Sequence, residues 1–137
     1  MTSSNNGKTA FQTTIEMIED NFAKIDFQPK IDWRFLYSPE ATFSPSTQIM
    51  MLAQNPRRSL NDPYDSNFPR ESLESGNAYR VEKWGMNPKR PNAQRRQRQV
   101  LEMFRLIAAQ IPYDPDSLVD ETLTANFCPF ASPRWDK

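Results

Sequence analysis

The chain has 137 residues, and its 17 basic side chains balance 17 acidic ones, which excludes a global field that would draw it to nucleic acid or to a membrane. A single cysteine and the absence of histidine exclude an intrachain disulfide, histidine-based nucleophilic catalysis, histidine-containing zinc sites and iron–sulfur clusters. We therefore expect no metal and no cofactor. No apolar run approaches the ~18 residues of a membrane span, and the polar N-terminus lacks the apolar core of a signal peptide, so we expect a cytoplasmic protein that does not contact a membrane.

The first third of the chain predicts a tail, one helix and an irregular connection. Residues 1–8 are polar and are expected to be a disordered tail, and residues 9–137 are expected to form one domain. From residue 9 to residue 25, apolar side chains recur at the spacing of an amphipathic helix that packs on a sheet: Phe11, Ile15, Ile18, Phe22 and Ile25. Residues 26–47 hold three prolines among aromatic side chains, which favours an irregular connection.

Two short runs, residues 49–53 and 122–125, predict strands, and the continuous apolar run 49–53 fits a strand that is buried on both faces, as in a parallel sheet. Between them we expect a long loop over residues 57–80, a helix over residues 92–110 and a turn region over residues 113–120. The apolar stripe of that helix is Val100, Met103, Phe104, Ile107 and Ile111. Because a strand, a crossover helix and a second strand give a parallel pair, the sequence predicts an α/β fold.

An asparagine follows each predicted strand. Asn55 lies in the motif Gln54-Asn55-Pro56, and Asn126 lies in the motif Asn126-Phe127-Cys128-Pro129. In open α/β sheets, the carboxyl ends of the strands form the edge where ligands bind. Two amides at that edge have the chemistry to orient a water or to read a base, and Gln54 adds further polar groups. The alternative is that both motifs are ordinary turns that end a strand.

Ala53-Gln54-Asn55-Pro56 resembles the first motif of the uracil-DNA glycosylase superfamily, and Asn126-Phe127-Cys128-Pro129 resembles the Asn-x-Cys-Pro strand end of its single-strand-selective branch. The resemblance covers residues 48–133. It implies a three-layer α/β/α domain, of which this chain is the N-terminal half. It also implies a DNA-repair activity, the hydrolysis of the N-glycosidic bond of uracil or a related damaged base, with uracil-containing or damaged DNA as the partner.

The same resemblance implies roles for individual residues. Asn55 would position or activate the hydrolytic water, and Asn126 would hydrogen-bond the Watson–Crick edge of a base flipped out of the stack. The aromatic that stacks on this base would be Phe68, with Tyr64 as the second candidate. Two features depart from the family pattern: Ala53 replaces the usual glycine, and the chain has no histidine to match the His-containing motif that stabilises the departing base in most members.

Basic residues are locally in excess between Arg80 and Arg105, where eight Lys or Arg side chains stand against two Glu. On a neutral protein, this excess predicts contacts with the phosphates of a nucleic acid, made by Lys89, Arg90, Arg95, Arg96 and Arg98. The alternative is a solvated helix face without a partner. Tyr79 and Trp84 beside it fit either base stacking or anchoring in the core.

Two strands are too few to complete a sheet that helices cover on both faces, so apolar surface is expected along an open edge. A partner chain that completes the sheet is one way to cover this surface. Two functions stay open beside the glycosylase. One is a non-catalytic nucleic-acid-binding module of the same fold, and the other is an α/β protein-interaction domain in which both asparagines only form turns.

Overall fold

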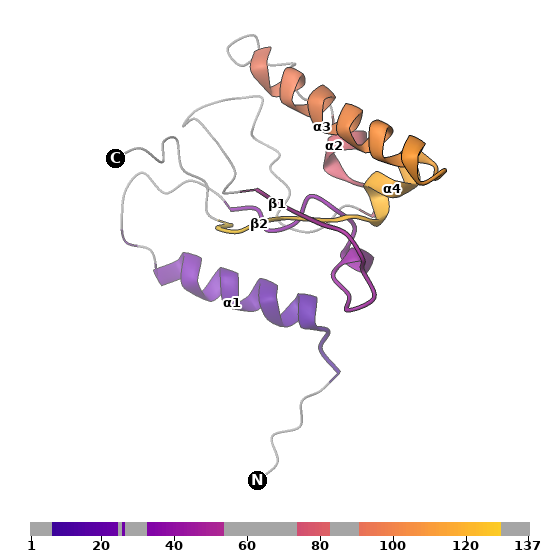
Figure 1. Ribbon diagram of the computed structural model, residues 1–137. Helices are drawn as coiled ribbons and strands as arrows, with labels where there is room; N and C mark the ends of the chain where they lie inside the picture. Colours follow the sequence, from indigo (N-terminus) through magenta and orange to yellow (C-terminus); the bar gives the residue numbers. More distant parts are fainter. Residues whose placement is uncertain (1–6, 25, 27–32, 54–73, 83–90, 130–137) are drawn as a thin grey trace.

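The computed structural model describes residues 7–24, 26, 33–53, 74–82 and 91–129 (Figure 1). Its elements are, in chain order, helix α1 (Ala10–Lys24), the 3₁₀ turn η1 (Glu40–Thr42), strand β1 (Met50–Ala53), helices α2 (Ala78–Val81), α3 (Pro91–Gln110) and α4 (Pro115–Glu121), and strand β2 (Leu123–Asn126). Both predicted strands and both predicted long helices are confirmed, with boundaries that differ by at most one residue. Residues 1–6 of the predicted tail lie outside the described residues.

The sheet is built on the parallel pair of β1 and β2. Its register sets Met50 opposite Leu123 and Ala53 opposite Asn126, so the two carboxyl ends coincide. The segment 33–38 runs along the other side of β2, where Leu36 forms an antiparallel bridge with Ala125. The fold is therefore α/β with a parallel pair, as the sequence predicts, and β2 is central among the described segments.

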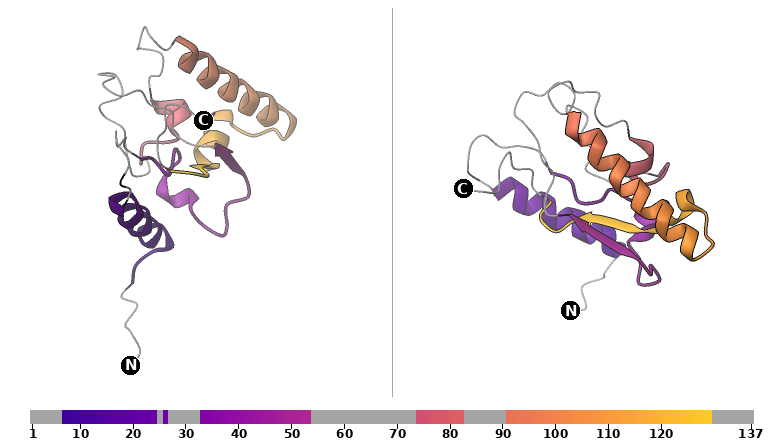
Figure 2. Two further views of the ribbon diagram at one scale, coloured as in Figure 1. Left: turned by 90° about the vertical axis from the view of Figure 1, so that its left-hand side faces the viewer. Right: turned by 45° about the horizontal axis from the view of Figure 1, so that its top comes forward.

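Helices cover both faces of this sheet, as Figure 2 shows. Successive side chains of a strand point to opposite faces, and each face has its own core. On one face, Ala125 packs with Leu36 and with Phe11 of α1. On the other face, half-buried Met51 packs against the core formed by α3 and α4, which contains Phe104.

Strand β1 differs from the expectation of burial on both faces. Its side chains alternate between half-buried and exposed, and Met50 and Leu52 are 60% and 54% exposed. The register places both side chains on the α1 face of the sheet, beside Leu123 and Ala125. Because α1 packs over β2 and the 33–38 segment, it leaves this side of β1 open. The exposed apolar surface expected for so short a sheet is therefore confirmed on β1.

Helix α3 faces the core with a stripe that agrees with the predicted one in part. The predicted Phe104 is buried and the predicted Val100 packs against the core, whereas the predicted Met103, Ile107 and Ile111 are 42%, 40% and 50% exposed. Ala108, which was not predicted, is buried. The axis of the buried face is displaced because α3 packs on the short helices α2 and α4 rather than flat on a wide sheet. The polar Gln97 belongs to this buried face, which an apolar pattern does not reveal.

Two short helices lie where the sequence predicts only loop or turn. Helix α4 occupies most of the predicted turn 113–120, because Pro115 at its first position and the Asp114 cap, which accepts from the Ser117 N–H group, start a helical turn. Helix α2 lies at the end of the predicted loop 57–80, most of which is outside the described residues.

Asn77 ties α2, α4 and β2 together. Its side-chain oxygen accepts from the Tyr79 N–H group and caps α2, while its amide nitrogen donates to the Val119 carbonyl and to the Thr124 hydroxyl. Its backbone N–H group donates to Asp120 at 2.9 Å. The side chain is fully buried, so these bonds also avoid the cost of an unpaired polar group.

Replacing Asn77 by alanine is expected to lower the free energy of unfolding by about 2–4 kcal/mol, because a helix cap is lost and buried partners lose their bonds. Urea denaturation followed by circular dichroism measures this value. Asn21→Ala is the matched control, since the Asn21 amide bonds to Met17 on the exposed face of α1; its effect is expected within about 0.5 kcal/mol. Equal losses in the two variants would contradict the role given to Asn77.

Candidate nucleic-acid interface

The two predicted strand ends meet at one edge of the sheet. Ala53 and Asn126 are register partners, and the N–H group of Phe127 donates to the Ala53 carbonyl at 2.8 Å. The two strands therefore end side by side, at Ala53 and Asn126. Six of the predicted site residues lie outside the described residues: Gln54, Asn55, Tyr64, Phe68, Lys89 and Arg90.

Asn126 is the predicted site residue at this edge that the structure describes, and it is 2% exposed. Its backbone N–H group donates to the Phe35 carbonyl, and its side-chain Nδ2 donates to the Arg34 carbonyl at 2.9 Å. Because a carbonyl only accepts, this bond identifies Nδ2 and leaves Oδ1 as the free half of the amide. No donor among the described residues reaches Oδ1.

A buried acceptor without a partner costs roughly 1–3 kcal/mol, so its presence needs an explanation. A turn former does not need such an atom, since turn amides bond to nearby backbone. A ligand N–H group that reaches Oδ1 would remove the penalty. The arrangement therefore suits a site that accepts one hydrogen bond from a bound molecule.

Arg34, whose carbonyl accepts the bond from Asn126, has a side chain that is 2% exposed. Its guanidinium makes a two-pronged pair with Glu82, with N–O distances of 3.1 and 2.7 Å, and its Nε donates to the Leu36 carbonyl. The same group lies 4.1 Å from the centre of the Tyr37 ring. A buried arginine held by a carboxylate, a carbonyl and an aromatic face is satisfied despite its desolvation.

The phenols of Tyr37 and Tyr79 lie next to this pair, with ring centres 5.9 Å apart. Burial raises the pKa of Tyr37 above its usual value, although the Arg34 charge and the Asn126 amide act in the opposite direction. Burial also raises the pKa of Tyr79, and the charge of Arg96 opposes it. Both phenols are thus neutral at pH 7, and of the two predicted roles for Tyr79, anchoring in the core is the one observed.

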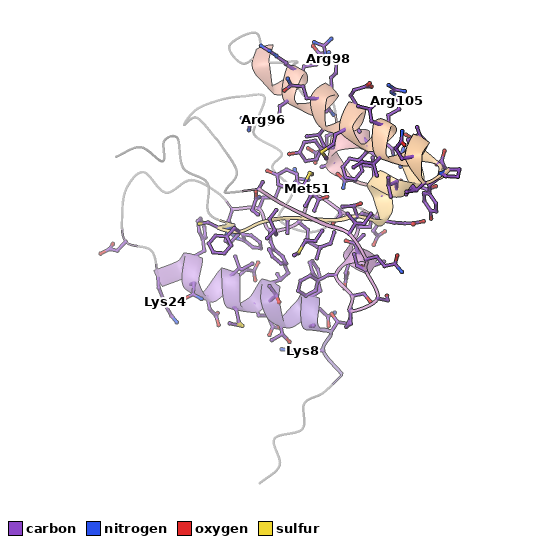
Figure 3. All side chains as sticks on the ribbon, viewed as in Figure 1. Lys8, Lys24, Met51, Arg96, Arg98 and Arg105 are labelled. Atoms are coloured by element: carbon purple, nitrogen blue, oxygen red, sulfur yellow. The ribbon has the colours of Figure 1, made fainter. Side chains whose placement is uncertain are left out.

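Three predicted phosphate-binding residues lie on the N-terminal half of α3, and Arg95, Arg96 and Arg98 are all exposed. None of them forms an ion pair within the described ranges, whereas Arg105 on the same helix pairs with Glu102. Figure 3 shows Arg98 and Arg105 projecting from α3 away from the sheet and Arg96 on a side nearer to it. Cations stabilise a helix at its C-terminal end, so helix stability does not explain this placement.

Other surfaces of the described residues offer less chemistry. A hollow of about 410 Å³ lies between the start of α1 and η1, at the end of the sheet opposite the strand carboxyl ends (Figure 1). No cluster of potential metal ligands occurs within the described ranges. None of the helices described there has the length and apolar character to cross a membrane.

Sequence reasoning missed Arg34, Glu82 and the exposed Phe127. The signal for Arg34 was one charged residue inside the run Trp33-Arg34-Phe35-Leu36-Tyr37, which is unusual for a segment that aromatics anchor in a core. Glu82 had no local signal, because its partner is distant in sequence. Phe127 follows Asn126 and is 82% exposed, so the edge presents one aromatic side chain to solvent.

Comparisons of the chain with protein-family models, with curated proteins and with solved structures gave no match.

Replacing Tyr37 by phenylalanine tests the electrostatics of this site. The unfolded phenol titrates near pH 10, and the folded pKa is raised, so the folded state keeps its proton longer. The stability that this provides is complete below about pH 10 and is lost as the pH rises through the folded pKa. Between about pH 9 and about pH 11, the free energy of unfolding should therefore fall more steeply for the wild type than for Tyr37→Phe. Identical slopes in urea denaturation would contradict the assignment.

Proposed function

We propose that this chain has a uracil-DNA glycosylase-type fold and acts in the hydrolysis of the N-glycosidic bond of uracil or a related damaged base in DNA. The observation that carries the proposal is the buried Asn126 amide at the carboxyl edge of the parallel strands. Its Oδ1 accepts no hydrogen bond from any of the described residues. Uracil offers a ring N–H group on its Watson–Crick edge. That group and Oδ1 are complementary.

The remaining roles belong to residues outside the described ranges and are part of the proposal. Asn55 comes two residues after Ala53 in the sequence, and Ala53 is the register partner of Asn126. It would position the attacking water, with Gln54 beside it. Phe68, or in second place Tyr64, would stack on the flipped base. These residue types would supply the water-positioning amide and the stacking aromatic that glycosidic hydrolysis on an extruded base uses.

Exposed basic side chains that form no ion pair within the described ranges support the DNA partner. Arg95, Arg96 and Arg98 carry three charges along one exposed helix half, and Lys89 and Arg90 precede it in sequence. Phosphate contacts from such side chains supply affinity without sequence preference. The exposed Met50 and Leu52 support a partner chain that extends the sheet beside β1. A cytoplasmic setting, in which Cys128 stays a thiol, belongs to the same proposal.

A non-catalytic nucleic-acid-binding module is the second candidate, because the chain has no histidine to match the motif that stabilises the departing base, while Asn126 and the exposed arginines of α3 would still bind a base and phosphates. It would bind uracil-containing DNA and leave the base attached. A protein-interaction domain is less well supported, since it gives no reason for the buried, unpartnered oxygen of Asn126.

Incubation with single-stranded DNA that contains one uracil is expected to leave alkali-labile abasic sites. Asn55→Ala should abolish cleavage and keep binding, because the water loses its orienting amide while the phosphate contacts remain. Asn126→Ala should weaken the preference for uracil-containing over uracil-free DNA. Asn21→Ala, on the exposed face of α1, is the control that should change neither. Retarded DNA with no abasic product would favour the binding module instead.

Arg98→Ala should reduce the slope of log K against log salt by about 1, because one phosphate contact is lost. Arg105→Ala is the matched control on the same helix, since Glu102 already neutralises that arginine. Its slope should equal that of the wild type. A slope that does not change in Arg98→Ala would remove Arg98 from the interface.

A further inference from the structure

The Asn126 amide needs a neighbour that decides which way round it lies. An amide group turned by half a circle keeps its shape and exchanges Oδ1 with Nδ2, so packing alone does not select an orientation. Among the described residues, Nδ2 donates to the Arg34 carbonyl at 2.9 Å, no donor reaches Oδ1, and the Tyr37 phenol lies near enough to the amide to interact with it. The bond to the Arg34 carbonyl assigns Nδ2 to the protein side, so the orientation of the acceptor that a ligand meets depends on where that carbonyl lies.

The backbone of Arg34 is held at both ends of the residue. Its N–H group donates to the Pro129 carbonyl at 2.7 Å, and its guanidinium reaches forward to the Leu36 carbonyl and across to Glu82. Because the side chain is buried, its charge needs compensation, and Glu82 is the carboxylate that provides it among the described residues. We expect loss of the pair with Glu82 to shift the guanidinium and, through it, the Arg34 backbone.

Glu82 is itself fixed by two helices. Its N–H group donates to the Ala78 carbonyl and ends α2, and its carbonyl accepts from Nε2 of Gln97 on α3 at 2.6 Å. Gln97 lies between Arg96 and Arg98 in sequence, and its own side chain is buried. The ion pair thus joins the strand-end amide to the helix that carries the exposed arginines.

We propose that Arg34 and Glu82 are positioning residues: their buried ion pair holds the Arg34 carbonyl against Nδ2 of Asn126 and so keeps Oδ1 turned toward the bound base. This inference rests on the proposed function for the identity of the ligand, whereas the orientation of the amide is a property of the chain without DNA. The two claims can therefore fail separately.

The experiment compares Arg34→Lys and Glu82→Gln with Arg80→Lys and Asp120→Asn. Arg80 and Asp120 form the same two-pronged type of pair, with N–O distances of 2.9 and 2.6 Å, away from Asn126. The first readout is the side-chain amide signal of Asn126 in ¹H–¹⁵N spectra without DNA. In Arg34→Lys and Glu82→Gln this signal should shift and its protons should exchange faster with water, and in the control pair it should stay in place.

The second readout is cleavage of single-stranded DNA with one uracil. Arg34→Lys and Glu82→Gln should lower kcat/KM by about 10- to 100-fold, the size of loss expected from a misplaced binding group, while the salt dependence of binding stays unchanged. The control variants should retain the wild-type value. If Arg34→Lys does not fold, Glu82→Gln decides, because it keeps the shape of the carboxylate and removes only its charge.

An Asn126 signal that does not respond to either test variant would overturn the positioning role. The same holds if the signal moves but cleavage equals that of the controls. If the wild type neither cleaves nor prefers uracil-containing DNA, yet the signal responds only to Arg34→Lys and Glu82→Gln, the proposed function fails and the positioning of the amide stands.

Discussion

The parallel pairing of β1 and β2, in a register that sets Ala53 opposite Asn126, is the constraint on which the rest of the structure depends. A parallel pair requires a crossover, and the helices of that crossover cover one face of the sheet while α1 covers part of the other. The same register brings the ends of the two strands, Ala53 and Asn126, to one edge. A slip by one residue would turn Asn126 to the opposite face and bury apolar side chains differently.

Next to that edge, the charged Arg34 is buried among aromatic side chains, where an apolar residue would be expected. Arg34 and Glu82 gain little net stability from their pairing, since the attraction is offset by the loss of hydration of both groups. The pair fixes the orientation of the Arg34 side chain, because a two-pronged guanidinium–carboxylate contact admits one geometry. Through it, the orientation of a single amide is connected to α2, to α3 and to the arginines on the surface.

Local patterns predicted much of this fold. The spacing of Phe11, Ile15 and Ile18 predicts α1, and two apolar runs that end in polar turns predict both strands, because burial on one element leaves a periodic trace. How the helices pack on the sheet decides which strand face and which helix face are covered. The exposure of Met50 and the displaced buried face of α3 therefore had no local signal in the sequence. Asn126 was predicted from its place after a strand, but the partners of its amide come from residue 34, far away in the chain.

The central claim is that the free oxygen of Asn126 receives a hydrogen bond from a base bound at this edge. The most direct measurement is a ¹H–¹⁵N titration of the protein with a single-stranded oligonucleotide that contains one uracil, compared with the same oligonucleotide carrying an abasic analogue at that position. The account predicts that the Asn126 side-chain signal shifts with uracil alone, while backbone signals of α3 shift with both. Identical shifts of the Asn126 signal with the two oligonucleotides, or shifts confined to α3, would contradict it.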